Sequence, residues 1–405
     1  MNRFIFILIF SITQLYSFGQ EKYVEATVER NNRFAIDYYK TLSTGNENMV
    51  LSPFGVTNCM AMAYIGCNKN TQQQIAYRMH FITPFGVLYS FKQLIKRFQV
   101  YKSKDVNLLI GNALWPNNEL NIKNKYKNLL KVNFQTHVQS LPFSNPDNKS
   151  SKLINRWAKK TSNYNIINMV RPEIINKNTK LIYTNFVYLS GNWENPFNKE
   201  FTGKNDFFLP DNTVSRIYFM NQTAYLKYNE NNVFQIVELP YSGNNISMIV
   251  LLPKKLDGVE SIEKMINPVN LDFWISGLYT KLVHVSLPKF KSEFRQDVVP
   301  VLRNMNCRLP FTESSNFNRI SDNKVFVSNI IQHTLIEVSE NKSENFTELF
   351  VDPDETQEIN DNFIRFKANR PFIYLVRDNA NGSILLMGKV ISPNFNKLSA
   401  DYNLK

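Results

Sequence analysis

The sequence predicts a mixed α/β protein of the α+β class, folded as one large domain. Residues 24–42 and 85–101 have apolar side chains at helical spacing, whereas 181–191 is an apolar run of strand length. No Pro/Gly/Ser-rich linker, change of composition or internal repeat divides the 405 residues. This length exceeds the usual range for a single hydrophobic core. The lack of a boundary nevertheless favours one domain over residues 20–396, followed by a short polar tail at 397–405.

The N-terminal residues 1–19 have the three parts of a secretory signal peptide. Arg3 supplies the basic start, residues 4–12 form the apolar stretch, and Ser17 and Gly19 are the small residues before a cleavage site. A membrane anchor needs about 20 apolar residues, and this run is shorter. We therefore expect a secreted, extracellular protein that does not insert into a membrane.

A second helix is predicted to begin after Ser52. Proline is tolerated in the first turn of a helix, so Pro53 suits this position. The residues that follow, up to Cys67, are apolar on nearly every side. We therefore expect this helix to be buried.

Few residues are available for metal binding or catalysis. Three cysteines are an odd number, which in an exported chain argues against a disulfide framework. We expect buried or incidental thiols. The four histidines belong to no HExxH motif, and the chain has no GxSxG, P-loop or dinucleotide fingerprint. The sequence therefore predicts no enzyme activity, no catalytic residue, no metal and no cofactor.

The chain is basic, with a formal charge of +13, but its charge is unevenly distributed. Residues 340–361 contain eight carboxylates and one lysine, so the remaining residues are more basic still. A basic body attracts polyanions, and an acidic segment attracts basic clefts. A well-solvated surface rich in lysine and asparagine explains the same composition.

The stretch from Ile331 to Pro371 contains the feature with the clearest functional meaning. Residues 331–340 alternate between apolar and polar side chains, as in a half-buried strand, and 363–378 are again β-branched and aromatic. Residues 341–361 between them are too polar to bury and unusually long for a connection. Such loops usually carry function or are disordered.

Several phrases, in order, resemble the serpin family, and the resemblance extends over residues 24–395. The phrases are NMVLSPFGVTNCMAMAYIGCNKNTQQQI, LIYTNFVYLSGNWENPF, FQIVELPYSGNNISMIVLLP, VHVSLPKFKSEF, FKANRPFIYLVRD and ILLMGKVISP. The resemblance implies a single-domain fold with a large central mixed sheet, smaller sheets and about eight or nine helices. It also implies that 341–361 is an exposed reactive-centre loop, offered to an endopeptidase as bait. Residues 151–170 resemble the helix that crosses the front of the sheet.

The hinge of the loop departs from the pattern of serpins that trap proteases. In those serpins the cleaved loop enters the sheet as a strand, which favours a glycine and a run of alanines in the hinge. Glu340 and Ser343 match the family pattern, but Lys342 replaces the glycine. The alanine run is replaced by Asn345, Phe346, Thr347 and Glu348. We therefore expect insertion to be slow or absent.

The bait bond is expected near Glu355, Thr356 and Gln357. No Arg, Lys or large aromatic residue precedes this bond, so trypsin-like and chymotrypsin-like proteases are poor candidates. Two kinds of target protease remain candidates. One is a serine protease that tolerates acidic or small polar residues, and the other is a papain-like cysteine protease.

The resemblance also assigns residues to the regions of the sheet that open when a loop inserts. Trp193 and Lys289 match positions at the breach, where Lys289 would form an exposed ion pair with Glu340. Polar positions of the shutter are matched by Ser52 and Asn185. At two other shutter positions the chain departs from the family pattern. Gly55 stands where other serpins have a small hydroxyl residue, and Gln332 stands where they often have a histidine.

Two kinds of surface site are also predicted. Lys92, Lys96 and Arg97 would form a sulfated-polysaccharide site on helix 85–101, and a solvated helix face explains the same three residues. N-glycosylation sequons occur at Asn148, Asn221, Asn245, Asn341, Asn345 and Asn381.

Two functions therefore remain open from the sequence. One is an inhibitor of an extracellular protease, acting by reversible docking instead of trapping. The other is a non-inhibitory serpin that acts as a carrier, a storage protein or a polysaccharide or matrix binder. We expect a monomer with no nucleic-acid partner in either case.

Overall fold

The computed structural model describes residues 2–143, 149–341 and 363–393, with side chains described from Glu21 onward. A five-stranded mixed sheet has the order β10-β11-β4-β2-β3. Its strands are β10 (Phe290–Asp297), β11 (Val327–Val338), β4 (Leu181–Gly191), β2 (Val106–Pro116) and β3 (His137–Val138). The central strands β11 and β4 are parallel and hydrogen-bonded to each other.

A nine-stranded sheet lies beside the five-stranded sheet and has the order β1-β14-β13-β8-β7-β6-β9-β12, with β5 paired to β6. Its strands are β1 (Met49–Leu51), β5 (Asn198–Phe208), β6 (Val214–Glu230), β7 (Phe234–Pro240), β8 (Ile246–Pro253), β9 (Tyr279–Pro288), β12 (Ile364–Lys367), β13 (Phe372–Asp378) and β14 (Ile384–Val390).

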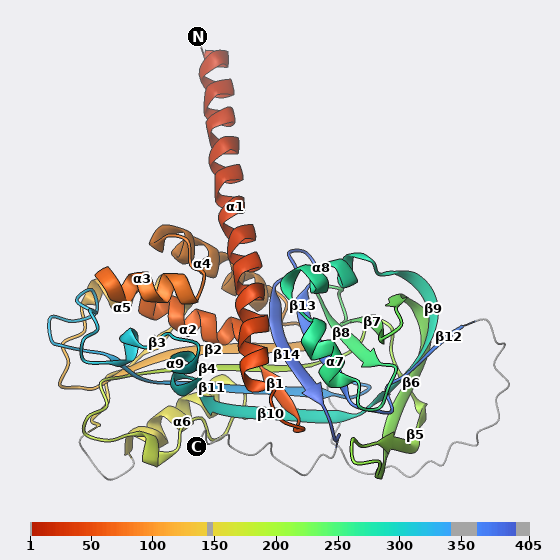
Figure 1. Ribbon diagram of the computed structural model, residues 1–405. Coiled ribbons are helices and arrows are strands. Elements are labelled where there is room, and N and C mark those ends of the chain that lie inside the picture. The colour runs from red at the N-terminus through yellow and green to blue at the C-terminus, as the bar shows by residue number, and fades with distance from the viewer. Residues whose placement is uncertain (1, 144–148, 342–362, 394–405) are drawn as a thin grey trace.

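Nine α-helices occur in the described ranges, within the number that the resemblance implies. They are α1 (Asn2–Leu42), α2 (Pro53–Gly66), α3 (Lys69–Arg78), α4 (Pro84–Val100), α5 (Asn124–Phe134), α6 (Lys149–Thr161), α7 (Val259–Met265), α8 (Pro268–Ser276) and α9 (Val299–Asn304). Two short 3₁₀ helices span Pro172–Ile174 and Leu309–Phe311. Helices α2 and α4 lie on one face of the five-stranded sheet and α6 lies on the opposite face (Figure 1).

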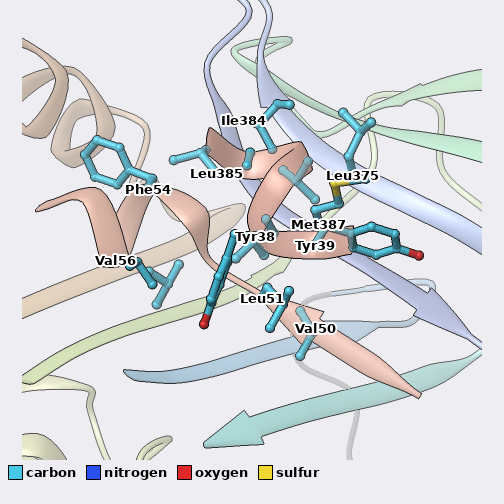
Figure 2. Packing of buried hydrophobic residues seen from close by; sticks show 14 of the residues in the cluster. Tyr38, Tyr39, Val50, Leu51, Phe54, Val56, Leu375, Ile384, Leu385 and Met387 are labelled. Atoms are coloured by element: carbon cyan, nitrogen blue, oxygen red, sulfur yellow. The ribbon is translucent and has the colours of Figure 1, made fainter. Parts of the chain in front are cut away.

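Helix α2 lies at the centre of the core, as its apolar sequence predicts. The Ser52 hydroxyl caps the helix by accepting a hydrogen bond from the backbone N–H of Gly55 at 3.1 Å, and Pro53 occupies the first turn. Every residue of α2 is buried. Figure 2 shows the adjoining part of the core, where Tyr38 and Tyr39 lie among apolar side chains of β1, β13 and β14.

Most predicted elements are present, with two corrections. The helix predicted over 151–170 ends at Thr161. Strand β11 is buried on both faces along most of its length instead of being half-buried. The reason is that α6 covers the second face, where Ile154 and Ala158 cluster with Ile331 and Leu335 of β11. The α+β class and the large mixed sheet are confirmed.

The long N-terminal helix α1 begins apart from the body of the protein and enters the core near its end (Figure 1). Among the described residues, no helix combines the length and the apolar character needed to cross a membrane. All three cysteines, Cys59, Cys67 and Cys307, are free and buried, as the sequence predicts. Burial raises the pKa of the Cys307 thiol to about 12.

Candidate functional site at the loop base and the central strand pair

The departure point of the long loop is held by a buried ion pair. Lys289 Nζ lies 2.8 Å from Glu340 Oε2, and the two side chains are 15% and 2% exposed. Thr202 of β5 donates a hydrogen bond from its hydroxyl to Glu340 Oε1 at 2.6 Å. The prediction of an exposed pair is therefore wrong, because β5 covers the carboxylate. Removing one partner of a buried pair leaves an uncompensated charge, which is strongly destabilising.

The residue before Glu340 is held by Trp193. The indole N–H of Trp193 donates to the backbone oxygen of Ser339 at 2.8 Å. The indole is 4% exposed and stacks on Tyr241 with a centroid distance of 4.5 Å. Since the indole is fixed on both sides, it holds the end of the β11 segment against the nine-stranded sheet.

The chain is held again where it resumes after the loop. Strand β12 pairs in parallel with β9, with Ile364 opposite Val283. The sequence-predicted hinge and bait-bond residues between these two anchors lie outside the described residues, as does the sequon at Asn148. These hinge and bait residues are Lys342, Ser343, Asn345, Phe346, Thr347, Glu348, Glu355, Thr356 and Gln357.

The central strands β4 and β11 are in direct contact, with Gln332 opposite Asn185. The parallel register is continuous from Asn329 to Ile336 of β11, after one irregularity near Val327. Any strand that entered the sheet here would first have to separate this pair. Insertion would therefore break the backbone hydrogen bonds between β4 and β11.

The predicted shutter residues come together beneath this strand pair. Gln332 donates from Nε2 to the backbone oxygen of Ser52 at 2.5 Å. A Cβ atom added at Gly55 would lie 1.9 Å from Asn185 Oδ1 and 2.7 Å from Gln332 Nε2. The absence of a side chain at Gly55 thus makes room for the amides of Asn185 and Gln332.

Two further shutter residues were missed by the sequence reasoning. Asn112 Oδ1 accepts hydrogen bonds from Asn185 Nδ2 and from Asn58 Nδ2, both at 2.8 Å. Both Asn58 and Asn112 are buried. The sequence signal that could have identified them is an asparagine within an apolar segment, Asn58 in the helix and Asn112 in the strand. Buried amides in such places need partners.

The three cations predicted as a polyanion site on α4 differ in their surroundings. Arg97 Nε lies 2.8 Å from Asp378 Oδ2, and the Asp378 side chain is fully buried. The Tyr101 hydroxyl donates to the same oxygen at 2.7 Å. Lys92 is half-buried and Lys96 is exposed. Arg97 therefore neutralises a buried carboxylate while its side chain stays 41% exposed, and the polyanion site stays a prediction.

The described sequons differ in exposure. Asn245 is exposed between β7 and β8, whereas Asn221, Asn341 and Asn381 are half-buried. Asn221 Nδ2 already donates to the backbone oxygen of Phe201 at 2.6 Å. Asn245 is thus the described sequon that leaves most room for a glycan.

Known proteins resemble this chain along most of its length. The family profile described as serpin (serine protease inhibitor) matches residues 29–393. Human Serpin B3 is 30% identical over 393 residues, which cover 90% of this chain and 99% of the relative. Mouse antithrombin-III is 28% identical over 395 residues, covering 93% of this chain and 85% of the relative.

A solved structure has the same fold. The structure of native protease nexin-1 with heparin superimposes with a TM-score of 0.79 and 27% sequence identity. The match covers 93% of this chain and 99% of that one. From the profile match, the identity and the sheet topology together, the chain belongs to the family of serpins (serine protease inhibitors), which are not enzymes.

Proposed function

We propose that this protein is a secreted inhibitor of an endopeptidase that offers its acidic loop to the protease but traps it poorly or not at all. The observation that supports the proposal best is the buried pair of Glu340 and Lys289, with Trp193 bonded to Ser339. These contacts fix where the loop leaves the body. A loop held at its base is suited to docking in a protease cleft.

The closed sheet and the hinge sequence argue against trapping. Entry of the loop would break the β4–β11 pairing and separate Gln332 from Asn185 in the register. The inserted strand would then have to bury Asn345 and neighbouring large or charged side chains. Burying an amide without a partner costs about 1–3 kcal/mol. Insertion of this hinge would therefore stabilise the protein less than insertion of a hinge in a trapping serpin, which has alanine at these positions.

The acidic loop also restricts the partner. Its eight carboxylates against one lysine favour a protease whose cleft is basic. Since no Arg, Lys or large aromatic residue precedes the bait bond, the candidates are a serine protease that accepts acidic or small polar residues and a papain-like cysteine protease. Docking without loop insertion would be reversible.

The test is incubation with a panel of serine and cysteine proteases, followed by denaturing electrophoresis and residual-activity measurements. We expect reversible loss of protease activity, or slow cleavage near Thr356, without a complex stable to SDS. A variant with Lys342→Gly and with residues 345–348 changed to alanine should form SDS-stable complexes with a serine protease. Stable complexes with the unchanged protein would overturn the proposed impairment.

A second candidate is a non-inhibitory serpin that acts as a carrier, a storage protein or a polysaccharide or matrix binder. The observation that favours it is the positive charge of the body, since the chain carries +13 despite its acidic loop. No change in the activity of any protease in the panel, together with binding to a sulfated matrix, would support this candidate over the first.

A further inference from the structure

The positive charge of the chain is concentrated around α6. Residues 149–180 contain eight basic residues and one acidic residue, Glu173, so this segment supplies +7 of the total +13. The basic residues are Lys149, Lys152, Arg156, Lys159, Lys160, Arg171, Lys177 and Lys180. The concentration is greater than on α4, which has three cations.

The helical period places four of these cations on the solvent face of α6. Lys152, Arg156 and Lys159 follow one another at intervals of four and three residues, and Lys160 lies beside them. All four side chains are exposed, while Ile154 on the opposite face is fully buried. With a rise of about 1.5 Å per residue, the charges recur every roughly 5 to 6 Å along the helix axis.

Nothing in α6 neutralises this row of charges. The helix contains no acidic residue, and none of the four side chains forms an ion pair with another described residue. On other helices the structure pairs basic side chains with carboxylates, as in Lys264 with Glu260 at 2.7 Å. Within the described part of the chain, no carboxylate therefore offsets the charge of this row.

The helix that carries the row is firmly seated. Trp157 lies 5.5 Å from Trp115 and 5.6 Å from Phe186 between ring centroids, on the sheet side of the helix. Asn155 Nδ2 donates to the backbone oxygen of Val170, and Asn155 Oδ1 accepts from the N–H of the same residue. The positions of the charges are thus largely set before any ligand arrives.

The segment beside α6 brings further cations. Arg295 Nη1 donates to the backbone oxygen of Asn168 at 2.6 Å. Burial and then the charge of Arg171 lower the pKa of Arg295, so the two guanidinium groups lie within electrostatic range of each other. Arg295 is half-buried, whereas Arg171 is exposed and extends the basic surface beyond the end of the helix.

We propose that the solvent face of α6 binds a linear sulfated polysaccharide through Lys152, Arg156, Lys159 and Lys160. A regular row of cations matches the repeated sulfates of such a chain. Single-stranded nucleic acid fits less well, because its binding uses aromatic side chains on which bases stack. Trp157 of α6 is turned toward the sheet, and the exposed ring of Tyr164 beyond the helix is already in contact with Lys159, whose Nζ lies 5.1 Å from the ring centroid. This inference goes beyond the proposed protease docking and does not depend on it.

The test compares two charge-matched variants on heparin-Sepharose. One carries Lys152→Gln, Arg156→Gln, Lys159→Gln and Lys160→Gln; the other carries Lys92→Gln, Lys96→Gln, Lys125→Gln and Lys131→Gln on α4 and α5. Both lose four charges, and glutamine preserves helix propensity. Unchanged melting temperatures establish that both variants are folded. Heparin affinity is also measured as a function of salt.

We expect the α6 variant to elute at clearly lower salt and the α4 and α5 variant to elute near the unchanged protein. The slope of log affinity against log salt should fall by roughly 0.7 to 0.9 for each cation removed, if counterion release follows nucleic-acid behaviour. Equal elution of the two variants, or a larger effect of the α4 and α5 set, overturns the proposal. So does equally tight binding of a single-stranded DNA of matched charge through the same four residues.

Discussion

Gln332 of β11 donates a hydrogen bond to the backbone oxygen of Ser52 at 2.5 Å, in space that the missing side chain of Gly55 leaves open. This contact joins the central strand pair to the first turn of α2. Movement of β11 away from α2 would break this hydrogen bond. The size of residue 55 therefore bears directly on whether the sheet remains closed.

Gly55→Ala should destabilise the protein. The added methyl group would overlap Asn185 Oδ1, and overpacking of a closed core costs about 1–3 kcal/mol. Urea unfolding measures the change in the free energy of unfolding. Gly86→Ala is the matched control, because its nearest neighbour is the half-buried ring of Tyr23, which has room to move. Equal effects of the two substitutions would contradict the steric role of Gly55.

Glu340→Gln should destabilise the loop base by removing the buried carboxylate that lies 2.8 Å from the ammonium of Lys289. Breaking a buried ion pair costs about 3–5 kcal/mol, and the 15% exposure of Lys289 places the expected value near the low end. The double variant Glu340→Gln with Lys289→Met should recover much of the loss. Additive single effects in this double-mutant cycle would show that the two residues do not act as a pair.

Arg97→Gln should lower the stability of the protein. The buried carboxylate of Asp378 would keep its hydrogen bond from Tyr101 but would lose the positive charge of the Arg97 guanidinium. The Arg97 side chain is 41% exposed, so solvent screening reduces the expected loss to about 1–2 kcal/mol. Lys96→Gln, one position earlier and exposed, is the control and should leave thermal unfolding nearly unchanged. A loss as large at Lys96 would point to a general effect of charge on α4.

Stability should fall in acid partly because of Glu293. Its hydrogen bond with His333, 2.6 Å between His333 Nε2 and Glu293 Oε1, holds the pKa of the Glu293 carboxyl below its usual value. A depressed carboxyl pKa stabilises the folded state above the unfolded value of about 4.3, and this stabilisation is lost as pH falls through the folded value. Glu293→Gln should flatten the pH dependence of unfolding below about pH 4.3. If the pH dependence of unfolding is the same in the variant, Glu293 does not contribute to the loss of stability in acid.

Cleavage of the loop near Thr356 should leave the melting temperature almost unchanged, because the hinge sequence opposes insertion of a new strand. A serpin that inserts its loop would instead gain far more than the roughly 2 °C that about 1 kcal/mol gives in a large domain. Differential scanning calorimetry before and after nicking measures the difference, with and without enzymatic deglycosylation. A large rise in both samples would refute the hinge argument, whereas a rise after deglycosylation alone would assign the block to glycans.

Local sequence patterns were sufficient for the elements whose boundaries depend on nearby residues. Ser52 and Pro53 mark the start of α2 because a hydroxyl cap and a first-turn proline act within one turn. The apolar run of residues 181–191 likewise predicts a fully buried β4. The ordered phrases were enough to predict the family, since the order of motifs is itself a property of the chain.

The tertiary structure decided which polar residues meet and which of them remain available. Nothing near Arg97 in the sequence indicates that it neutralises Asp378, which lies 281 positions away, nor that β5 covers Glu340. The row of cations on α6 was visible in the sequence, but its exposure depends on how the opposite face of the helix is buried. Burial and the pairing of charges depend on distance in space, which the order of residues along the chain does not specify.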